Sequence, residues 1–290
     1  MGILYSDAVN LLKAREGLSG GKAVTLGHLT AYFHPSEVRA LRGHASLDQA
    51  ARDWLDAYEW GTKADGFFLH ALKFDTIDSI DFSEFEGATI VHDLSQPLPA
   101  ELERKFDLAV DGGTLEHVFN FPVAVANLMR LVRQGGLVYA LSPCNNMAGH
   151  GFYQFSPELM FRIFSADNGF ETVFVRLVEA RYPAVEATRG HRIYDVTDPE
   201  RARRRVNLTN ARPTLIVTMA RCVRECEPFQ KAVLQSDYVP RWKNQKVSTT
   251  TPLRTLGRRY VPRSLWMMVR GIGMLRRASF RNKSHFRRIS

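Results

Sequence analysis

The feature of this sequence that most constrains its fold is a series of short apolar segments, each of which closes on a carboxylate or a glycine. Gly27, Asp81, Asp93 and Asp111 close the segments at 22–27, 75–81, 89–93 and 106–111. A short apolar run bounded in this way is typical of a strand buried on both faces of a parallel sheet. Since parallel strands share one carboxyl edge, the pattern predicts a sheet edge lined with acids.

Stretches with helical spacing separate these segments. Apolar side chains recur through residues 35–72 at the spacing of two or three helices, and a further helix is predicted from about 122 to 133, where Gly135 and Gly136 mark its end. A fifth strand is expected at 137–141, ended by Ser142-Pro143. Strands that alternate with helices indicate an α/β fold with helices on both faces of the sheet.

Two later segments complete the predicted sheet. Ser156 is expected to cap a helix that begins at Pro157, and strands follow at 170–178 and 213–223. The chain is therefore expected to form one domain over residues 1–238. Its two insertions lie at 29–72 and 180–212.

Charge divides the chain sharply. Residues 241–290 hold 14 Lys or Arg and no Asp or Glu, which leaves 25 basic against 30 acidic residues before them. Residues 239–290 are therefore predicted to form a basic tail that meets a polyanion.

Within this tail, one stretch has the pattern of an amphipathic helix. Its apolar face is Leu265, Met268, Val269, Ile272 and Leu275. The hypothesis is that residues 260–290 contact an anionic membrane surface. Three alternatives stay open: a helix docked on the domain, a tail that is disordered in isolation, and nucleic-acid binding supported by aromatic residues in the tail.

No run of about 18 apolar residues occurs, and the N-terminus lacks the layout of a signal peptide. A cytoplasmic protein with peripheral membrane attachment is the expectation. Cys222 and Cys226 have neither neighbouring histidines nor a second cysteine pair, so free thiols and no metal site are predicted.

One region resembles a known family. The stretch Phe-Asp-Leu-Ala-Val-Asp-Gly-Gly-Thr-Leu-Glu-His-Val-Phe at 106–119, with Gly135-Gly136 before the next strand, is similar to the fourth and fifth strand region of class I S-adenosylmethionine-dependent methyltransferases. The resemblance spans some 70 residues, from Asp75 to about Asn145. It implies a Rossmann-like fold with a seven-stranded, mostly parallel sheet in the order 3-2-1-4-5-7-6, with strand seven antiparallel.

The resemblance also implies roles for individual residues, with S-adenosylmethionine as cofactor and an unidentified methyl acceptor. The residues that match are Gly27 for close backbone approach, Asp81 for ribose, Asp93 and Leu94 for adenine, and Asp111 and Glu116 for the methionine end. The alternatives are local: strand-end acids for Asp81 and Asp93, a turn cap for Asp111, and an ion pair with arginine for Glu116.

The first loop departs from the family pattern. Residues 25–30 keep one glycine, Gly27, and have Thr25 where the family has an acid. Since absent glycines restrict the backbone, a non-catalytic binding or scaffolding protein that has lost its cofactor remains the alternative. A nicotinamide-dependent oxidoreductase is disfavoured because no Gly-x-Gly-x-x-Gly motif occurs.

Two histidines are candidates for acid-base chemistry. His150 lies between Gly149 and Gly151 after the fifth predicted strand, and His117 follows Glu116. Either imidazole could serve as a general base for a hydroxyl or amine acceptor, or could be an ordinary hydrogen-bonded loop residue. Methyl transfer chiefly requires an aligned acceptor, so the reaction does not demand such a base.

Overall fold

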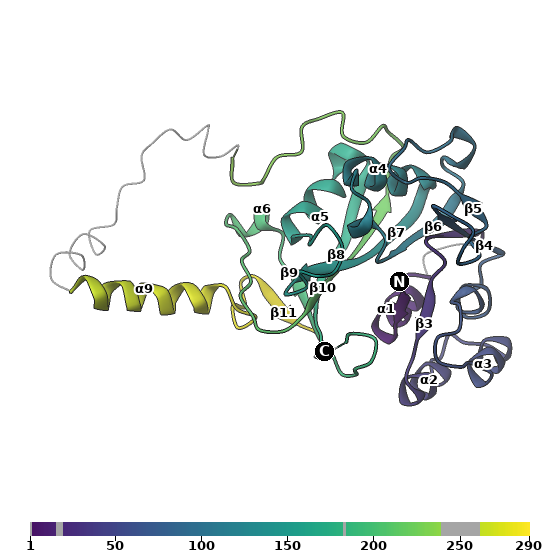
Figure 1. Cartoon of the computed structure of the whole chain (residues 1–290), viewed down its shortest axis with the longest axis horizontal. Coiled ribbons are helices and arrows are strands. Elements are labelled where there is room, and N and C mark those ends of the chain that lie inside the picture. The colour runs from purple at the N-terminus through teal and green to yellow at the C-terminus, as the bar shows by residue number, and fades with distance from the viewer. Residues whose placement is uncertain (1, 16–19, 182–183, 239–261) are drawn as a thin grey trace.

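The computed structural model describes residues 2–15, 20–181, 184–238 and 262–290. The part of the predicted basic tail at 239–261 lies outside these residues. A mixed sheet of nine strands forms the centre of the molecule, in the order β11-β9-β8-β10-β7-β6-β2-β4-β5 (Figure 1). The strands are β2 (Lys22–Leu26), β4 (Thr76–Asp81), β5 (Ile90–Val91), β6 (Phe106–Gly112), β7 (Val132–Asn145), β8 (Phe170–Glu179), β9 (Arg192–Val196), β10 (Thr214–Cys222) and β11 (Phe286–Arg288).

The sheet has a parallel half and an antiparallel half. Strands β5, β4, β2, β6 and β7 pair in parallel, whereas β10 pairs antiparallel with both β7 and β8. The seven predicted strands thus occur in the predicted order, with the seventh antiparallel.

The prediction of seven strands is wrong, because two more pair antiparallel at the β8 edge. Strand β9 lies in the predicted insertion at 180–212 and pairs with β8, and β11, near the end of the chain, pairs with β9. Half of the pairings are therefore antiparallel. Both strands are short and were not predicted from the sequence, so pairing with neighbouring strands decides their structure.

Helices cover both faces of the sheet. One core contains apolar side chains of α4 (Phe121–Leu131) and α5 (Pro157–Ile163). The other contains those of α1 (Tyr5–Arg15), α2 (Pro35–Arg42), α3 (Gln49–Asp56) and the π-helical turn η1 (Phe67–Ala71). A second, two-stranded sheet joins β1 (Gly2–Leu4) to β3 (Thr30–Tyr32).

Local signals place several of these elements. The Ser156 side chain accepts a hydrogen bond from the Leu159 amide, and Pro157 occupies the first turn, so the predicted start of α5 is confirmed. The predicted end of the fifth strand at Ser142-Pro143 is wrong. Strand β7 continues to Asn145, because β10 pairs along it and a register irregularity at Thr214/Leu215 accommodates the change.

The C-terminal segment combines a projecting helix with an anchored end. Helix α9 (Arg263–Arg277) extends away from the body of the domain in Figure 1. After it, Phe280 stacks on Tyr194 with ring centroids 4.0 Å apart, and Phe286 is buried. Among the described residues, no helix is both long and apolar enough to span a membrane.

Candidate functional site

The carboxyl ends of β2, β4 and β5 are joined by backbone hydrogen bonds. The Gly27 amide donates to the Ile80 carbonyl at 2.7 Å, and the His92 amide donates to the Asp81 carbonyl at 2.8 Å. Gly27 has φ of 72°, a left-handed conformation that favours glycine. The three strand ends that carry the predicted nucleotide contacts are therefore neighbours along one edge.

The residue that replaces the expected acid in the first loop has a structural role. Thr25 is buried, and its hydroxyl donates to the Gly27 carbonyl at 2.7 Å. This bond within the turn fixes the loop without a charge. The polar position of the family motif is thus occupied by a side chain that stabilises the loop itself.

A network of polar residues ties the first loop to two other segments. The imidazole of His28 contacts an Asp65 carboxylate oxygen at 2.7 Å and the Glu86 carbonyl at 2.8 Å. Lys63 donates to the His28 carbonyl at 2.8 Å and pairs with the Glu86 carboxylate at 3.3 Å. These four residues could not be predicted as a group, because residues so far apart in the chain give no local signal.

The predicted adenine and ribose contacts also make local bonds. One Asp81 carboxylate oxygen accepts from the Phe82 amide at 2.6 Å, and one Asp93 oxygen accepts from the Ser95 amide at 2.8 Å. Hydrogen bonds from Ser95 hold the pKa of Asp93 below its usual value. Leu94 is buried in the core. The cofactor roles of these three residues stay predictions.

Asn127 of α4 positions the loop that carries Asp93 and Leu94. It has no exposed surface, and its amide group donates to the Leu94 and Gln96 carbonyls while its oxygen accepts from the Leu98 amide. These bonds provide hydrogen-bond partners both for the buried Asn127 side chain and for backbone groups of the loop. The helix therefore fixes the loop after β5 from the side of the core.

Asp111 is the second-last residue of β6, and its side chain is fully buried. One carboxylate oxygen accepts from the amides of Thr114 at 2.8 Å and Leu115 at 3.3 Å, and the other accepts from the Ser142 hydroxyl at 3.4 Å. Burial raises the pKa of Asp111 to about 6, and the hydrogen bonds oppose that rise. The carboxyl group caps the turn after β6, which was the structural alternative considered for it.

Glu116 lies in the short 3-10 turn η3 (Leu115–His117) and is also buried. Burial, and after it the nearby charge of Asp111, raises the pKa of Glu116 to about 8. One of its oxygens lies 3.4 Å from His150 Nε2. The alternative of an arginine partner is not what the described residues show, since the side chain that contacts the Glu116 carboxylate is this histidine.

Hydrogen bonds hold the loop of His150 against Glu116. The Phe152 and Tyr153 amides donate to the Glu116 carbonyl at 2.8 and 3.3 Å. Gly151 has φ of 77°, and a Cβ there would lie 2.8 Å from that carbonyl oxygen. The rings of His150 and His117 have centroids 5.2 Å apart, so both candidate histidines lie beside Glu116.

A cavity of about 530 Å³ opens beside these groups. Glu116, His117 and His150 line it together with residues of β1 and the segment 184–186. Neither Gly27, Asp81 nor Asp93 contributes to its lining. The predicted site residues therefore fall into a nucleotide group at the ends of β2, β4 and β5 and an acid–histidine group at the ends of β6 and β7.

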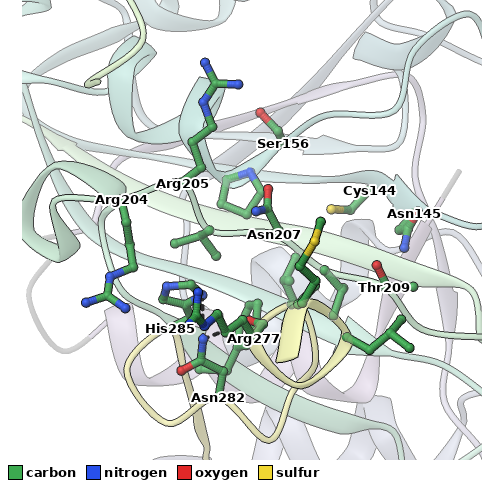
Figure 2. A pocket seen from close by; sticks show the side chains of 18 of the residues that line it. Cys144, Asn145, Ser156, Arg204, Arg205, Asn207, Thr209, Arg277, Asn282 and His285 are labelled. Atoms are coloured by element: carbon green, nitrogen blue, oxygen red, sulfur yellow. Dashed lines mark hydrogen bonds between the residues drawn. The ribbon is translucent and has the colours of Figure 1, made fainter. Parts of the chain in front are cut away.

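Figure 2 shows a second cavity, of about 890 Å³, between the loop after β7 and the C-terminal segment. Arg204 and Arg205 contribute from the segment before β10, and Arg277 contributes from the end of α9. Arg205 pairs with Asp237 at 2.9 Å. This cavity was not predicted, because its walls come from three distant parts of the chain.

Comparison with known proteins gives likeness in fold only. No protein-family model and no curated protein matches the chain. Similar solved structures include a SAM-dependent methyltransferase from Thermotoga maritima, which has 14% identity over 76% of this chain and 89% of that chain, with a TM-score of 0.41.

Another similar structure is the 1,6-didemethyltoxoflavin-N1-methyltransferase of Burkholderia thailandensis with bound S-adenosylhomocysteine. It shows 15% identity over 76% of this chain and 78% of that chain, with a TM-score of 0.40. Likeness at this level says nothing about the activity of this chain.

Proposed function

We propose that the protein transfers a methyl group from S-adenosylmethionine to an acceptor that is still unidentified. The observation that carries this proposal is the junction between β2 and β6, where strand order reverses. The Thr114 hydroxyl donates to the Leu26 carbonyl at 2.7 Å and so links the two strand ends. Ligands of open α/β sheets bind in the crevice at such a point.

The side chains around this junction fit the parts of the cofactor. In this proposal Asp81 accepts hydrogen bonds from the ribose hydroxyls, Asp93 and Leu94 meet the adenine, and Gly27 allows close backbone approach. Asp111 and Glu116 lie on the other side of the junction, where the methionine end and its sulfonium charge would lie. His117 and His150 line the adjoining cavity, which is where the acceptor would enter.

The competing proposal is a scaffolding protein without cofactor. It is favoured by the His28, Lys63, Asp65 and Glu86 network, which ties the first loop to segments beside it. The two proposals differ in one measurable property: only the first requires binding of S-adenosylmethionine or its demethylated product.

Calorimetric titration of the full chain with S-adenosylmethionine and S-adenosylhomocysteine separates them. We expect saturable binding of both, and a loss of about 1 to 3 kcal/mol for Asp81→Ala and for Asp93→Ala, because each removes a hydrogen bond to a buried ligand. Asp53→Ala, on the exposed face of α3, is the matched control. Binding of neither ligand supports the scaffold, and unchanged affinity in both variants contradicts the site assignment.

We also propose that α9 attaches the protein to an anionic membrane surface. Leu265, Met268, Val269, Ile272 and Leu275 are all exposed, between 45% and 60%. The 14 basic residues of 241–290, with no acid among them, give this segment the charge that anionic lipid attracts. An exposed apolar face on a basic helix is the arrangement of an interfacial helix.

Sedimentation with vesicles tests this attachment. The full chain should sediment with phosphatidylserine-containing vesicles, far less with neutral vesicles, and less as salt rises. The double variant Met268→Ser/Ile272→Ser, which keeps every charge and keeps β11, should bind at least about tenfold more weakly because the apolar face no longer inserts. Equal sedimentation of variant and parent excludes the apolar face, and binding of nucleic acid without lipid contradicts the proposal.

A further inference from the structure

We infer that Glu116, His117 and His150 bind one divalent transition-metal ion at the carboxyl end of β6. One ligand atom of each side chain lies within 4.8 Å of the others, which modest side-chain rotation would bring to coordination distance. Within the described part of the chain, this is the one group of three such side chains that could hold an ion. Each of the three residues is a site candidate from sequence, but their grouping could not be predicted, because His150 is 33 residues from His117.

One carboxylate oxygen of Glu116 lacks a hydrogen bond of ordinary geometry to any described residue. Glu116 is 1% exposed, and its Oε2 has no hydrogen-bond partner of ordinary geometry among the residues that the structure describes. A buried carboxylate oxygen without a partner costs free energy. A bound cation would supply the missing partner and would also offset the proximity of a second buried carboxyl group, Asp111.

The histidines are held where a metal would need them. The amides of Phe152 and Tyr153 anchor the loop to the Glu116 carbonyl, and the His150 amide donates to the Met147 carbonyl at 2.9 Å. His150 Nε2 already lies 3.4 Å from the carboxylate. His117 follows Glu116 directly in η3, so the backbone of one turn positions two of the three ligands.

The donor set selects the kind of metal. Two imidazoles and one carboxylate suit Zn²⁺, Co²⁺, Ni²⁺ or Fe²⁺, whereas Mg²⁺ and Ca²⁺ prefer oxygen ligands. Three protein ligands leave coordination positions for water or another molecule. Since all three side chains line the cavity of about 530 Å³, those positions would face a space that a small molecule can enter.

This inference uses Glu116, His117 and His150, which the proposed methyl transfer also uses, but metal binding by these side chains requires no part of the cofactor. Its test therefore uses metal alone. The full chain, stripped with chelator, is titrated with Zn²⁺ by calorimetry and with Co²⁺ by visible absorption, in which bound cobalt reports nitrogen ligation directly. We expect one saturable site per chain in both titrations.

The variants His117→Ala, His150→Ala and Glu116→Gln should each weaken binding by at least about tenfold, as loss of a metal contact does. His70→Ala, an exposed histidine on η1, is the matched control and should bind as the parent does. Because His117 and His150 are exposed, their variants should keep the fold, which circular dichroism checks.

Absence of a one-to-one site in the parent overturns the inference, and so does unchanged affinity in both histidine variants. Either result would leave the calorimetry with S-adenosylmethionine unaffected. Conversely, metal binding by a chain that binds no S-adenosylmethionine would uphold the inference and refute the proposed methyl transfer. The two ideas can therefore fail separately.

Discussion

Carboxyl groups are buried in two regions of the protein, and the two regions differ in the hydrogen bonds that these groups receive. Asp7 of α1 accepts hydrogen bonds from the Tyr139 hydroxyl at 2.6 Å and from the Leu4 amide at 2.8 Å. Glu116, after β6, is equally buried, yet its Oε2 has no hydrogen-bond partner of ordinary geometry among the described residues. Burial raises the pKa of Asp7 to about 6 and that of Glu116 to about 8.

The difference separates an architectural group from a functional candidate. Asp7 joins β1 and α1 to the middle of β7, so its bonds fix the N-terminal segment to the sheet. Glu116 lies against a cavity with two histidines beside it. A carboxylate oxygen without a hydrogen-bond partner destabilises the fold there, but it is available to contact a ligand. Three variants, two at the Asp7 region and one beside Asp111, test this difference.

The largest effect is expected from Asp7→Asn. The folded-state pKa of about 6 lies above the ordinary value of 3.8, so the folded protein favours the protonated acid. The contribution of Asp7 to wild-type stability should therefore fall as pH rises from about 4 to 6, by about 3 kcal/mol for a shift of roughly two pKa units. Below pH 4 both states are protonated and this loss is absent.

Urea denaturation at pH 4 and pH 7 measures the effect, because Asp7→Asn should lack this component of the pH dependence. Asp53→Asn, which changes an exposed carboxylate, should retain it. If Asp7→Asn and wild type lose the same free energy of unfolding between the two pH values, ionisation of Asp7 does not destabilise the fold. The role assigned to Asp7 in fixing the N-terminal segment would then be wrong.

A smaller effect is expected from removing the hydroxyl donors. Tyr139→Phe takes a 2.6 Å bond from Asp7 and should lower the free energy of unfolding by about 2 kcal/mol at pH 7. Ser142→Ala takes a 3.4 Å bond from Asp111, which keeps two backbone amide donors, and should cost less than about 1 kcal/mol. Chemical denaturation of both variants decides the order, and a larger loss for Ser142→Ala would contradict it.

Much of the parallel half of the sheet could be predicted from sequence. Apolar runs closed by Asp81 and Asp111 became β4 and β6, because strands buried on both faces have a strong local signature. Asp111, however, belongs to the strand itself and is buried, so its environment differs from that of an exposed strand-end acid. The acid was visible in the sequence, but its burial was not.

The antiparallel half was predicted less well. Strands β9 and β11 were missed, and β7 runs past Pro143 although proline usually ends a strand. Each of these depends on a partner strand far away in sequence. Residues 286–288 were assigned to the basic tail, yet they pair with β9 and belong to the domain's sheet.

Local patterns in the sequence are enough to predict the alternation of strands and helices, the carboxyl edge with its acids, and the amphipathic pattern of α9, because each depends on residues close together in the chain. Which acids are buried, and which of them have hydrogen-bond partners, depends on the folded structure. It brought His150 to Glu116, tied His28 to Asp65, and added β11 to the edge of the sheet. The physical reason is that burial and hydrogen bonding depend on neighbours in space, which local patterns do not record.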